Sequence, residues 1–522
     1  MGLKESLDAL RKAGLIDPRH VAASTAAFAR WGPTAATPYA AAAVRHPRRP
    51  AVVDHRGSIS FRRLDSQSSA LARGLRASGL RAGQRLGLFC RNHRDFVEAN
   101  LAAAKAGMPV VYLNTGFAPA QLADVAEREG VDLLVADHGL LETVRQAGVD
   151  AQVVVVDGEA AGVMGIDQLR ARGRRHPTLL TPRVTSPVLL TSGTTGTPKG
   201  AQRTGASVDA TSALGILQRI PYKTGDVFVV ACPLFHAWGL GQLLTAAAMG
   251  STVVINPTFT AGSTLEAVAE HEATVLAVVP VMLQRILAEP ALDATELESL
   301  RIVASSGSAL PGPVALEWID RVAPNLYNMY GSTEVGQATI ADPGDLQAAP
   351  GTAGRVVPGS TVRILDDLGA EVATGAEGRI FVGNGAQFSG YTGGGTKEQI
   401  EGLMASGDVG YFDDQGRLFV TGRSDDMIIS GGENVFPREV EDVLLAHADI
   451  DDVGVVGVDD ADFGQRLAAF VVLRSGAELS ADAVRSLVSS QLARHKVPRD
   501  VAFVDELPRT TTGKLLRREL VP

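Results

Sequence analysis

The sequence predicts an α/β protein, in which a large N-terminal domain with βαβ-type sheets and a small β subdomain precedes an α+β C-terminal domain. The first observation is length, because 522 residues are too many for one hydrophobic core and two or more domains are expected. The second is an alternation of short apolar runs with helix-like segments between about residues 50 and 300. The third is a change of pattern after residue 350 and again near residues 422–432.

The alternating region is typical of βαβ units and largely parallel sheets, because helical patterns follow the apolar runs. Leu64, Leu71 and Leu75 share one face of a predicted helix, and an alanine-rich helix is expected over Phe96–Ala106. Sheets of this kind bind ligands at the carboxyl ends of their strands. The predicted strands are Arg85–Phe89, Val131–Ala136, Val153–Val156, Val227–Ala231, Thr252–Ile255 and Val275–Val279.

Glycines punctuate short alternating strands after residue 350, which predicts a small antiparallel or barrel-like subdomain. A break at Gly422–Gly432 leads into a helix that begins around Pro437, with Val440, Val443 and Leu444 on one face. The expected elements after it are strands Val453–Val458 and Ala468–Leu473 and a helix over Ala481–Ala493. We therefore place the large domain at residues 1–424 and the C-terminal domain at residues 425–522.

Composition narrows the function classes. A net charge of −9 leaves no basic footprint for nucleic acid, and it disfavours adhesion to anionic membranes. Cys90 and Cys232 lie in apolar surroundings and are expected to be buried structural thiols. We find neither a signal peptide nor an apolar run of transmembrane length, so a soluble, cytoplasmic protein is expected. Leu3, Leu7 and Leu10 have helical spacing and predict a helix that packs onto the body.

The most informative segment is the loop that follows the apolar run Val188–Leu190. Glycines let backbone amides point inward as an anion-binding nest, hydroxyls add hydrogen-bond donors, and a lysine adds a positive charge. The spacing differs from that of the P-loop of nucleotide triphosphatases. An ordinary Ser/Gly turn is the alternative, but so many matched positions favour a phosphate-binding loop. Its residues are Thr191, Ser192, Gly193, Thr194, Thr195, Gly196 and Lys199.

Thr191–Gly200 resembles the signature loop of the adenylate-forming superfamily, which includes acyl-CoA synthetases, firefly-type luciferases and the adenylation domains of peptide synthetases. Four further segments match in order, so the resemblance covers nearly the whole chain from about residue 30. It implies that the loop binds the phosphates of ATP and that Thr191 also contributes to the Mg²⁺ site.

The second matching segment is Pro233–His236. A lone histidine at a strand end would more often be a core residue. The resemblance instead implies that His236 is a catalytic residue that lines the acyl pocket and places the substrate carboxylate near the α-phosphate. The expected pocket residues are His236, Trp238, Gly239, Gly307 and Gly331.

The third segment is Tyr330–Glu334. By resemblance, Tyr330 stacks on adenine, Thr333 contacts phosphate and Glu334 is a catalytic ligand of Mg²⁺. Such a carboxylate is needed because the metal must draw charge from a triphosphate that an anion attacks. A surface glutamate in a turn is the alternative. The remaining residues expected at the nucleotide are Ser308, Gly331 and Ser332.

The last two segments surround Asp408 and Lys514. The resemblance implies that Asp408 accepts hydrogen bonds from both ribose hydroxyls, that Arg423 contacts ribose or phosphate, and that Asp425 is the hinge of a mobile C-terminal domain. Lys514 resembles the lysine that bridges the acyl carboxylate and the α-phosphate. A solvated aspartate and a solvated tail lysine are the alternatives from the residues alone.

The resemblance implies two half-reactions with ATP, Mg²⁺ and coenzyme A. The acid first attacks the α-phosphorus and forms an acyl-adenylate with release of pyrophosphate; a thiol then displaces AMP after the C-terminal domain reorients. The thiol tunnel is expected along a loop that contains Ser430, Gly431 and Gly432. We leave the oligomeric state open, with a homodimer as one option.

The substrate prediction rests on the residues after His236. They are Ala237, Trp238, Gly239 and Leu240, so no aspartate is present to pair an amino-acid ammonium. The small side chains expected in the acyl pocket leave space there, which predicts a medium- to long-chain fatty acid as the substrate. The alternatives are an aryl- or short-chain-acid CoA ligase and a fatty acyl-AMP ligase that loads a carrier protein. A non-catalytic nucleotide-binding protein would predict loss of Lys514 or Glu334, and both are present.

Overall fold

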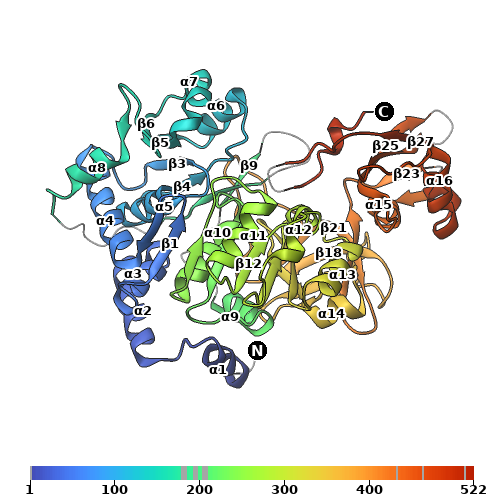
Figure 1. The fold of residues 1–522 in the computed structure, drawn as a ribbon, viewed down its shortest axis with the longest axis horizontal. Coiled ribbons are helices and arrows are strands. Elements are labelled where there is room, and N and C mark those ends of the chain that lie inside the picture. The colour runs from blue at the N-terminus through green and yellow to red at the C-terminus, as the bar shows by residue number, and fades with distance from the viewer. Residues whose placement is uncertain are drawn as a thin grey trace. The chain divides into compact units, whose positions relative to one another are not determined.

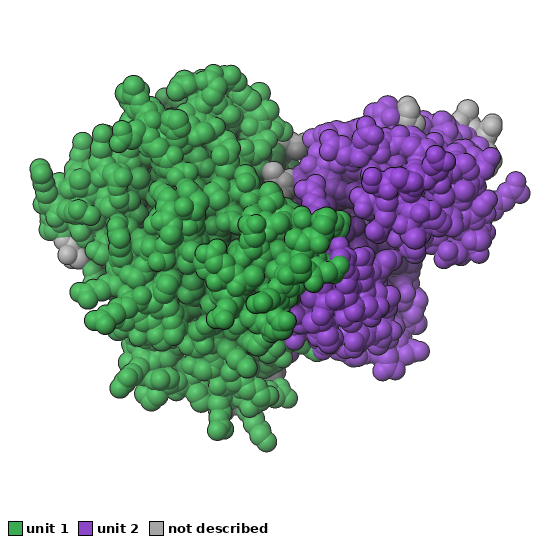
Figure 2. Space-filling model, in the orientation of Figure 1, with its two compact units in different colours: residues 1–278, 288–304, 384–397 green, residues 279–287, 305–383, 398–522 purple. Residues whose placement is uncertain are grey.

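The computed structural model describes residues 3–177, 185–191, 198–202, 210–430, 433–460, 464–510 and 513–521. The chain forms two compact units, which Figure 2 distinguishes by colour. The first unit comprises residues 1–278, 288–304 and 384–397, and the second comprises residues 279–287, 305–383 and 398–522. The predicted boundary between residues 424 and 425 is a functional division and remains a prediction.

An eight-stranded sheet lies within the first unit, in the order β19-β9-β8-β4-β3-β5-β6-β7. The strands from β8 to β7 are parallel, whereas β9 pairs antiparallel with β8 and with β19. Burial on both faces explains the continuous apolar runs of these strands. Their bounds are β3 Arg85–Phe89, β4 Val110–Tyr112, β5 Val131–Asp137, β6 Gln152–Val156, β7 Met164–Gly165, β8 Val188–Thr191, β9 Lys199–Gln202 and β19 Gly390–Tyr391.

A second group of strands in the first unit is also mostly parallel. Strand β10 pairs parallel with β11 and β12, β11 pairs parallel with β1, and β2 closes the edge antiparallel to β1. The bounds are β1 Pro50–Asp54, β2 Gly57–Ser60, β10 Val227–Val230, β11 Thr252–Val254, β12 Val275–Val278 and β13 Ile302–Ser305, the last of which spans the boundary between the units. These strands confirm the predicted βαβ pattern.

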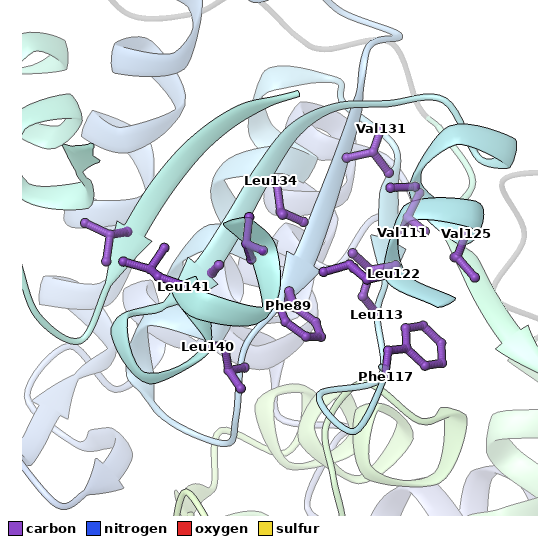
Figure 3. Close-up of a cluster of buried hydrophobic side chains, with 14 of the residues drawn as sticks. Phe89, Val111, Leu113, Phe117, Leu122, Val125, Val131, Leu134, Leu140 and Leu141 are labelled. Carbon is purple, nitrogen blue, oxygen red and sulfur yellow. The ribbon is translucent and has the colours of Figure 1, made fainter. Parts of the chain in front are cut away.

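Helices connect and cover the strands of the first unit. Helices α4, α5 and α8 pack beside one another (Figure 1), and α6 and α7 cover an apolar cluster that includes Phe89, Leu122 and Leu134 (Figure 3). The bounds are α1 Leu3–Lys12, α2 Pro18–Trp31, α3 Ala36–Arg45, α4 Phe61–Ala77, α5 Arg94–Ala106, α6 Pro119–Arg128, η1 His138–Leu140, α7 Leu141–Ala147, α8 Ile166–Gly173, α9 Ala210–Arg219, α10 Ala237–Ala248, α11 Ala261–Glu270 and η2 Leu292–Ala294.

The N-terminal helix packs on the body through a face that differs from the predicted one. Leu7 is half exposed, whereas Ala9 and Ala13 are buried. The backbone carbonyl of Ala13 accepts hydrogen bonds from the amide and the hydroxyl of Thr224, at 2.9 Å and 2.8 Å. Small side chains allow this close approach, so the alanines rather than Leu7 form the contact.

The second unit contains two antiparallel groups of strands and the C-terminal module. Strands β14, β15 and β16 form a meander, and β17, β18, β20, β21 and β22 form the predicted small antiparallel subdomain. Their bounds are β14 Leu326–Ser332, β15 Gly336–Ala341, β16 Arg355–Val356, β17 Thr361–Leu365, β18 Gly378–Gly383, β20 Gln399–Ile400, β21 Leu403–Phe412 and β22 Leu418–Arg423; the helices are α12 Pro280–Leu287, α13 Gly312–Arg321 and α14 Pro343–Ala348.

The C-terminal module is α+β, as predicted. A five-stranded sheet has the order β24-β23-β26-β25, with β27 parallel to β26, and its apolar face packs on the two helices around Val440, Val455 and Val484. The bounds are β23 Ile428–Ser430, β24 Glu433–Val435, α15 Pro437–Leu445, β25 Ile450–Asp460, β26 Gly464–Leu473, α16 Ala481–Gln491, η3 Arg494–Lys496, β27 Asp500–Phe503 and η4 Arg517–Glu519.

Two further expectations concern thiols and membranes. Cys90 and Cys232 are free and fully buried, as predicted, and burial raises the pKa of the Cys232 thiol to about 12. Within the described ranges, no helix combines the length and the apolar character that a membrane span requires.

Candidate active site

Both described ends of the predicted phosphate loop belong to one strand pair. Strand β8 ends at Thr191 and β9 begins at Lys199, and the Thr191 hydroxyl donates to the Lys199 carbonyl at 3.3 Å. The Lys199 ammonium lies 5.3 Å from the centre of the Tyr391 ring, a cation–π distance. Ser192, Gly193, Thr194, Thr195 and Gly196 lie outside the described residues.

A buried carboxylate supports the base of this loop. Glu129 is fully buried, and one of its oxygens accepts a hydrogen bond from the Thr392 hydroxyl at 2.8 Å. The Thr392 amide donates to the Gly200 carbonyl at 2.8 Å. A Cβ at Gly200 would come too close to side-chain atoms of Glu129 and Thr392, so a larger residue there would displace them. Sequence reasoning missed Glu129 and Thr392, because a glutamate before a strand carries no local sign of such a partner.

The segment after β10 places His236 at the end of a loop and Trp238 in the first turn of α10. His236 is the N-cap of α10, and its ring lies 4.5 Å from that of Phe235, centre to centre. The Trp238 indole N–H donates to the carbonyl of Val278 at 2.9 Å, so the ring lies at the carboxyl end of β12. Burial lowers the pKa of His236 from 6.5 to about 4. The imidazole is therefore neutral at pH 7 and can exchange hydrogen bonds with a carboxylate.

We expect His236 to make stability fall with acidification. The unfolded chain binds a proton near pH 6.5, whereas the folded chain does so only near pH 4, so the wild type loses stability as the pH falls through this window. The variant His236→Gln lacks this titration. Thermal unfolding of both proteins from about pH 7 to about pH 4.5 should move the difference in Tm in favour of the variant. A difference in Tm that stays constant across this range would contradict the assigned pKa.

Asn92 holds the same loop from the neighbouring sheet, and sequence reasoning missed it. Its side-chain amide donates to the Cys232 carbonyl at 3.0 Å, and its carbonyl oxygen accepts from the Leu234 amide at 2.9 Å. Asn92 is buried, so its loss would leave the Cys232 carbonyl and the Leu234 amide without this hydrogen-bond partner, at a cost in stability. The asparagine follows β3 directly, and its position after a predicted parallel strand was the available signal.

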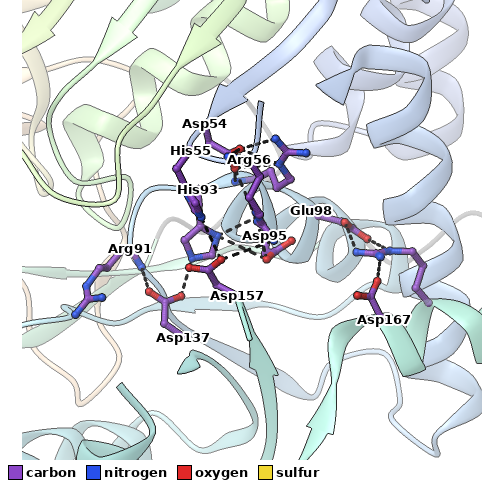
Figure 4. A network of polar contacts seen from close by, with 12 residues as sticks. Asp54, His55, Arg56, Arg91, His93, Asp95, Glu98, Asp137, Asp157 and Asp167 are labelled. Carbon is purple, nitrogen blue, oxygen red and sulfur yellow. Dashed lines mark hydrogen bonds and ion pairs between the residues drawn. The ribbon is translucent and has the colours of Figure 1, made fainter. Parts of the chain in front are cut away.

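Polar side chains around Asn92 form a network at the carboxyl ends of β1, β3 and β5. Figure 4 shows Asp54, Arg56, His93, Asp95 and Asp137 turned toward one another. His93 is buried and contacts a carboxylate oxygen of Asp137 at 2.7 Å, and Arg56 donates to Asp95 at 2.8 Å. These groups satisfy one another, which indicates that the network stabilises the strand ends.

Three of the predicted pocket glycines have a backbone reason for lacking a side chain. A Cβ at Gly239 would lie inside van der Waals contact of the Pro233 carbonyl, and a Cβ at Gly331 would collide with the Gly336 carbonyl. Gly307 has a φ of +98°, which L side chains rarely adopt. Their absence of side chains therefore has a local cause, and their place in an acyl pocket remains a prediction.

The second unit brings together the side chains predicted to bind the nucleoside. The Tyr330 hydroxyl donates to one oxygen of Asp408 at 2.6 Å, and Arg423 lies 3.5 Å from the other. Asp408 and Arg423 face each other across β21 and β22, so strand register places them as neighbours. Asp408 also has its backbone amide bonded to the Ser406 hydroxyl at 3.0 Å.

Lys514 and Asp425 belong to the same charged group. Arg423 donates to both oxygens of Asp425, at 2.7 Å and 3.0 Å. Burial and the positive charge of Arg423 lower the pKa of Lys514, whereas Asp426 and Asp408 raise it. The second unit therefore collects Tyr330, Asp408, Arg423, Asp425 and Lys514. Gly431 and Gly432 of the predicted tunnel lie outside the described residues, while Ser430 is buried at the end of β23.

Glu334, the predicted metal ligand, lies in the turn between β14 and β15. It is buried, and the amides of Glu334 and Val335 donate to the Ser332 hydroxyl at 3.2 Å and 3.3 Å, which shapes the turn. Thr333 is half-buried in this turn, and Ser308 is half-buried after β13. Among the described residues no group of three metal-ligating side chains is found. One carboxylate fits Mg²⁺ that arrives with ATP, because such ions keep water and phosphate oxygens as their other ligands.

Comparison with family models identifies the chain. Residues 39–392 match the AMP-binding enzyme model, and residues 439–514 match the C-terminal domain of the same enzymes. The chain belongs to this family of AMP-binding enzymes. The predicted adenylate-forming superfamily and the predicted fold class are therefore confirmed.

Relatives of this AMP-binding enzyme span nearly its whole length. It is 32% identical to an indoleacetate–CoA ligase of Aromatoleum aromaticum over 490 residues, which cover 92% of the chain and 94% of the relative. It is 30% identical to the fatty acid–acyl-carrier-protein ligase ScoC of Streptomyces coeruleorubidus, with the same coverage. The o-succinylbenzoate CoA synthetase of Bacillus subtilis, solved with its acyl-adenylate, aligns with a TM-score of 0.80 at 27% identity over 92% of this chain and 97% of that one.

These findings confirm the enzyme class in its coarse form. The chain is an AMP-forming enzyme of the acid–CoA ligase kind, and ATP, Mg²⁺ and coenzyme A are the cofactor and co-substrates of such enzymes. The fatty-acid prediction has weaker support than the aryl-acid alternative.

Proposed function

We propose that this enzyme is an AMP-forming CoA ligase whose acid carries an aromatic ring. The observation that carries the proposal is the aromatic, uncharged segment after β10. His236 and Trp238 lie there, and residues 231–242 contain no Asp, Glu, Lys or Arg. Aromatic rings favour offset or edge contacts with aromatic side chains. The indoleacetate and o-succinylbenzoate enzymes, whose names specify aromatic acids, support the same assignment.

The charged group in the second unit suits the adenylation step. A carboxylate is a poor electrophile until its oxygen gains a good leaving group, and AMP provides one. Lys514 would bridge the two anions that must approach each other, the substrate carboxylate and the α-phosphate. Burial and the positive charge of Arg423 lower its pKa, and an incoming anion would offset both effects. Mg²⁺ bound by Glu334 and ATP would draw charge from the phosphates.

The nucleoside would lie against Tyr330 and Asp408. The Tyr330 hydroxyl already donates to Asp408, so its ring is held in a fixed orientation on which adenine could stack. Asp408 can accept from a ribose diol through its remaining lone pairs. Arg423 lies 3.5 Å from this carboxylate, so a positive charge faces it across the strand pair.

The thiol half-reaction would use the C-terminal domain, residues 425–522, after rotation about Asp425. Asp425 is exposed and pairs with the neighbouring Arg423, an ion pair that lies at the predicted hinge. Exposed ion pairs contribute little to stability, which suits a reversible hinge. Ser430, Gly431 and Gly432 would then border the pantetheine arm.

Transfer to a carrier protein is a second candidate, favoured by the ScoC relative, which is a ligase for a fatty acid and an acyl-carrier protein. The two candidates differ in acid and in thiol. Both use the same adenylation chemistry, so the distinction lies in the acyl pocket and in the second half-reaction.

The test is AMP release with a panel of acids, each with and without coenzyme A. Benzoate, cinnamate and indoleacetate represent aryl acids, and acetate, octanoate and palmitate represent alkyl acids. We expect CoA-dependent AMP release with the highest kcat/KM for one of the aryl acids. A maximum for octanoate or palmitate would restore the fatty-acid prediction, and acyl-AMP that accumulates regardless of CoA would indicate carrier loading.

A further inference from the structure

Lys514 lies on a turn whose two arms are joined by backbone hydrogen bonds. The Thr510 amide donates to the Lys514 carbonyl at 2.8 Å, and the Leu516 amide donates to the Pro508 carbonyl at 2.9 Å. These bonds hold the arms together, but they do not determine where the turn sits on the module. Its position depends on the side chains that anchor it.

Apolar contacts provide the first anchor. Leu515 and Leu520 pack with Val456 and Phe470 of strands β25 and β26. A side chain at Gly454 would collide with both leucines, so the strand leaves room for them. Dispersion and burial hold these groups together, yet they are non-directional and tolerate small shifts.

Arg517 provides a directional anchor three residues after Lys514. Its two terminal nitrogens donate to the two carboxylate oxygens of Glu441 in α15, at 2.5 Å and 3.0 Å. One of them also donates to the Val455 carbonyl in β25 at 2.5 Å. Glu441 in turn accepts a hydrogen bond from the Val455 amide at 2.8 Å. The guanidinium therefore joins the lysine turn to a helix and a strand at once.

The same guanidinium reaches the predicted hinge. Its Nε lies 3.5 Å from a carboxylate oxygen of Asp426, which directly follows Asp425. Arg517 is thus in contact both with the core of the module and with the segment about which the module is expected to rotate. A lysine could not make this set of contacts, because an ammonium lacks the planar fork.

We propose that Arg517 is a positioning residue for adenylation, which holds the Lys514 turn in register with the hinge segment through Glu441, Val455 and Asp426. The proposal rests on the adenylation role of Lys514 given above. Arg517 does not need to touch the substrate. Its effect is to keep the lysine ammonium within the small range of positions that bridges a carboxylate and a phosphate.

The test is a double-mutant cycle between Arg517→Ala and Lys514→Ala on acid-dependent pyrophosphate exchange. A misplacement of about 1 Å can cost about 100-fold, so we expect Arg517→Ala to lower exchange by about 10- to 100-fold. Reaction of synthetic acyl-AMP with CoA should stay within about threefold of the wild type, a separation that a general loss of folding would not produce. In the Lys514→Ala background, loss of Arg517 should change the residual exchange by less than about twofold, because the two residues act as one unit.

Two further variants serve as controls for misfolding and for non-specific effects of charge. Glu441→Gln keeps the shape of the acceptor and removes its charge, so it should give a smaller loss of the same kind. Arg485→Ala removes a half-buried arginine of the same module, which pairs with Asp482 and donates to the Arg499 carbonyl, and it should leave exchange unchanged.

The outcomes separate this inference from the function on which it rests. Equal losses in both half-reactions, or a full Arg517 effect in the Lys514→Ala background, would overturn the positioning role. Normal exchange in Lys514→Ala would instead overturn the adenylation role of the lysine itself, whatever Arg517 does.

Discussion

Replacement of Lys514 by alanine is expected to lower acid-dependent pyrophosphate exchange by about 10²- to 10³-fold, the usual cost of losing one group that stabilises charge in a transition state. The lysine lies in a largely buried place, where burial and Arg423 lower its pKa, and charges interact more strongly where water is excluded. The basic side chains that flank it in the chain, Arg509 and Arg517, are engaged with Asp452 and Glu441, so we do not expect them to replace it.

The same variant should still convert pre-made acyl-AMP and CoA into thioester at close to the wild-type rate. Attack of a thiol on an activated carbonyl requires no bridge between a carboxylate and a phosphate. Lys496→Ala is a matched control, because Lys496 lies in the same module and pairs with Glu439. Equal loss of both half-reactions in Lys514→Ala would refute the assigned role, and a comparable loss in Lys496→Ala would indicate a non-specific charge effect.

Gly239→Ala is expected to disturb the loop that carries His236 and Trp238. The added methyl group would collide with the Pro233 carbonyl, which is backbone and cannot rotate away. The first turn of α10 would have to move, and with it the His236 N-cap. A displacement of that size should lower kcat/KM for the acid by about 100-fold, with a smaller change in KM for ATP.

Gly241→Ala is the matched control two residues further along the same helix. A Cβ at Gly241 meets no described atom within 4 Å, and alanine in a helix interior is favoured over glycine by about 0.5–1 kcal/mol. Tm should therefore rise slightly in Gly241→Ala and fall in Gly239→Ala. Equal kcat/KM values for the two variants would show that the close contact at Pro233 does not control the loop.

The strands and helices could be predicted wherever burial is periodic or continuous. The predicted runs at Arg85–Phe89 and Val131–Ala136 are largely apolar because both faces of a parallel sheet are covered, and the structure has strands at Arg85–Phe89 and Val131–Asp137. The N-terminal leucines were less informative, because a helix with small residues can pack through alanines, as α1 does. Sequence periodicity does not distinguish these two faces when both are partly apolar.

The functional residues likewise divide into those that short motifs predict and those that depend on partners distant in sequence. Tyr330, Asp408 and Arg423 were predicted from short motifs, and the structure brings them within hydrogen-bonding or ion-pair range. Asn92 and Glu129 were not predicted, because their partners are distant in sequence. Asn92 binds the Cys232–Leu234 backbone, and Glu129 binds Thr392.

The sequence by itself determined the fold class, the order of the motifs and the adenylate-forming family, because loop glycines, strand periodicity and motif spacing are local properties of the chain. Only the tertiary structure decided which buried polar groups support those motifs. It placed Arg517 in contact with Glu441 and Val455, and through burial it lowered the pKa values of His236 and Lys514. It also showed why residue 239 is a glycine, because a side chain there would collide with the backbone. Burial and long-range hydrogen bonding depend on which segments meet in space, and local sequence does not specify that.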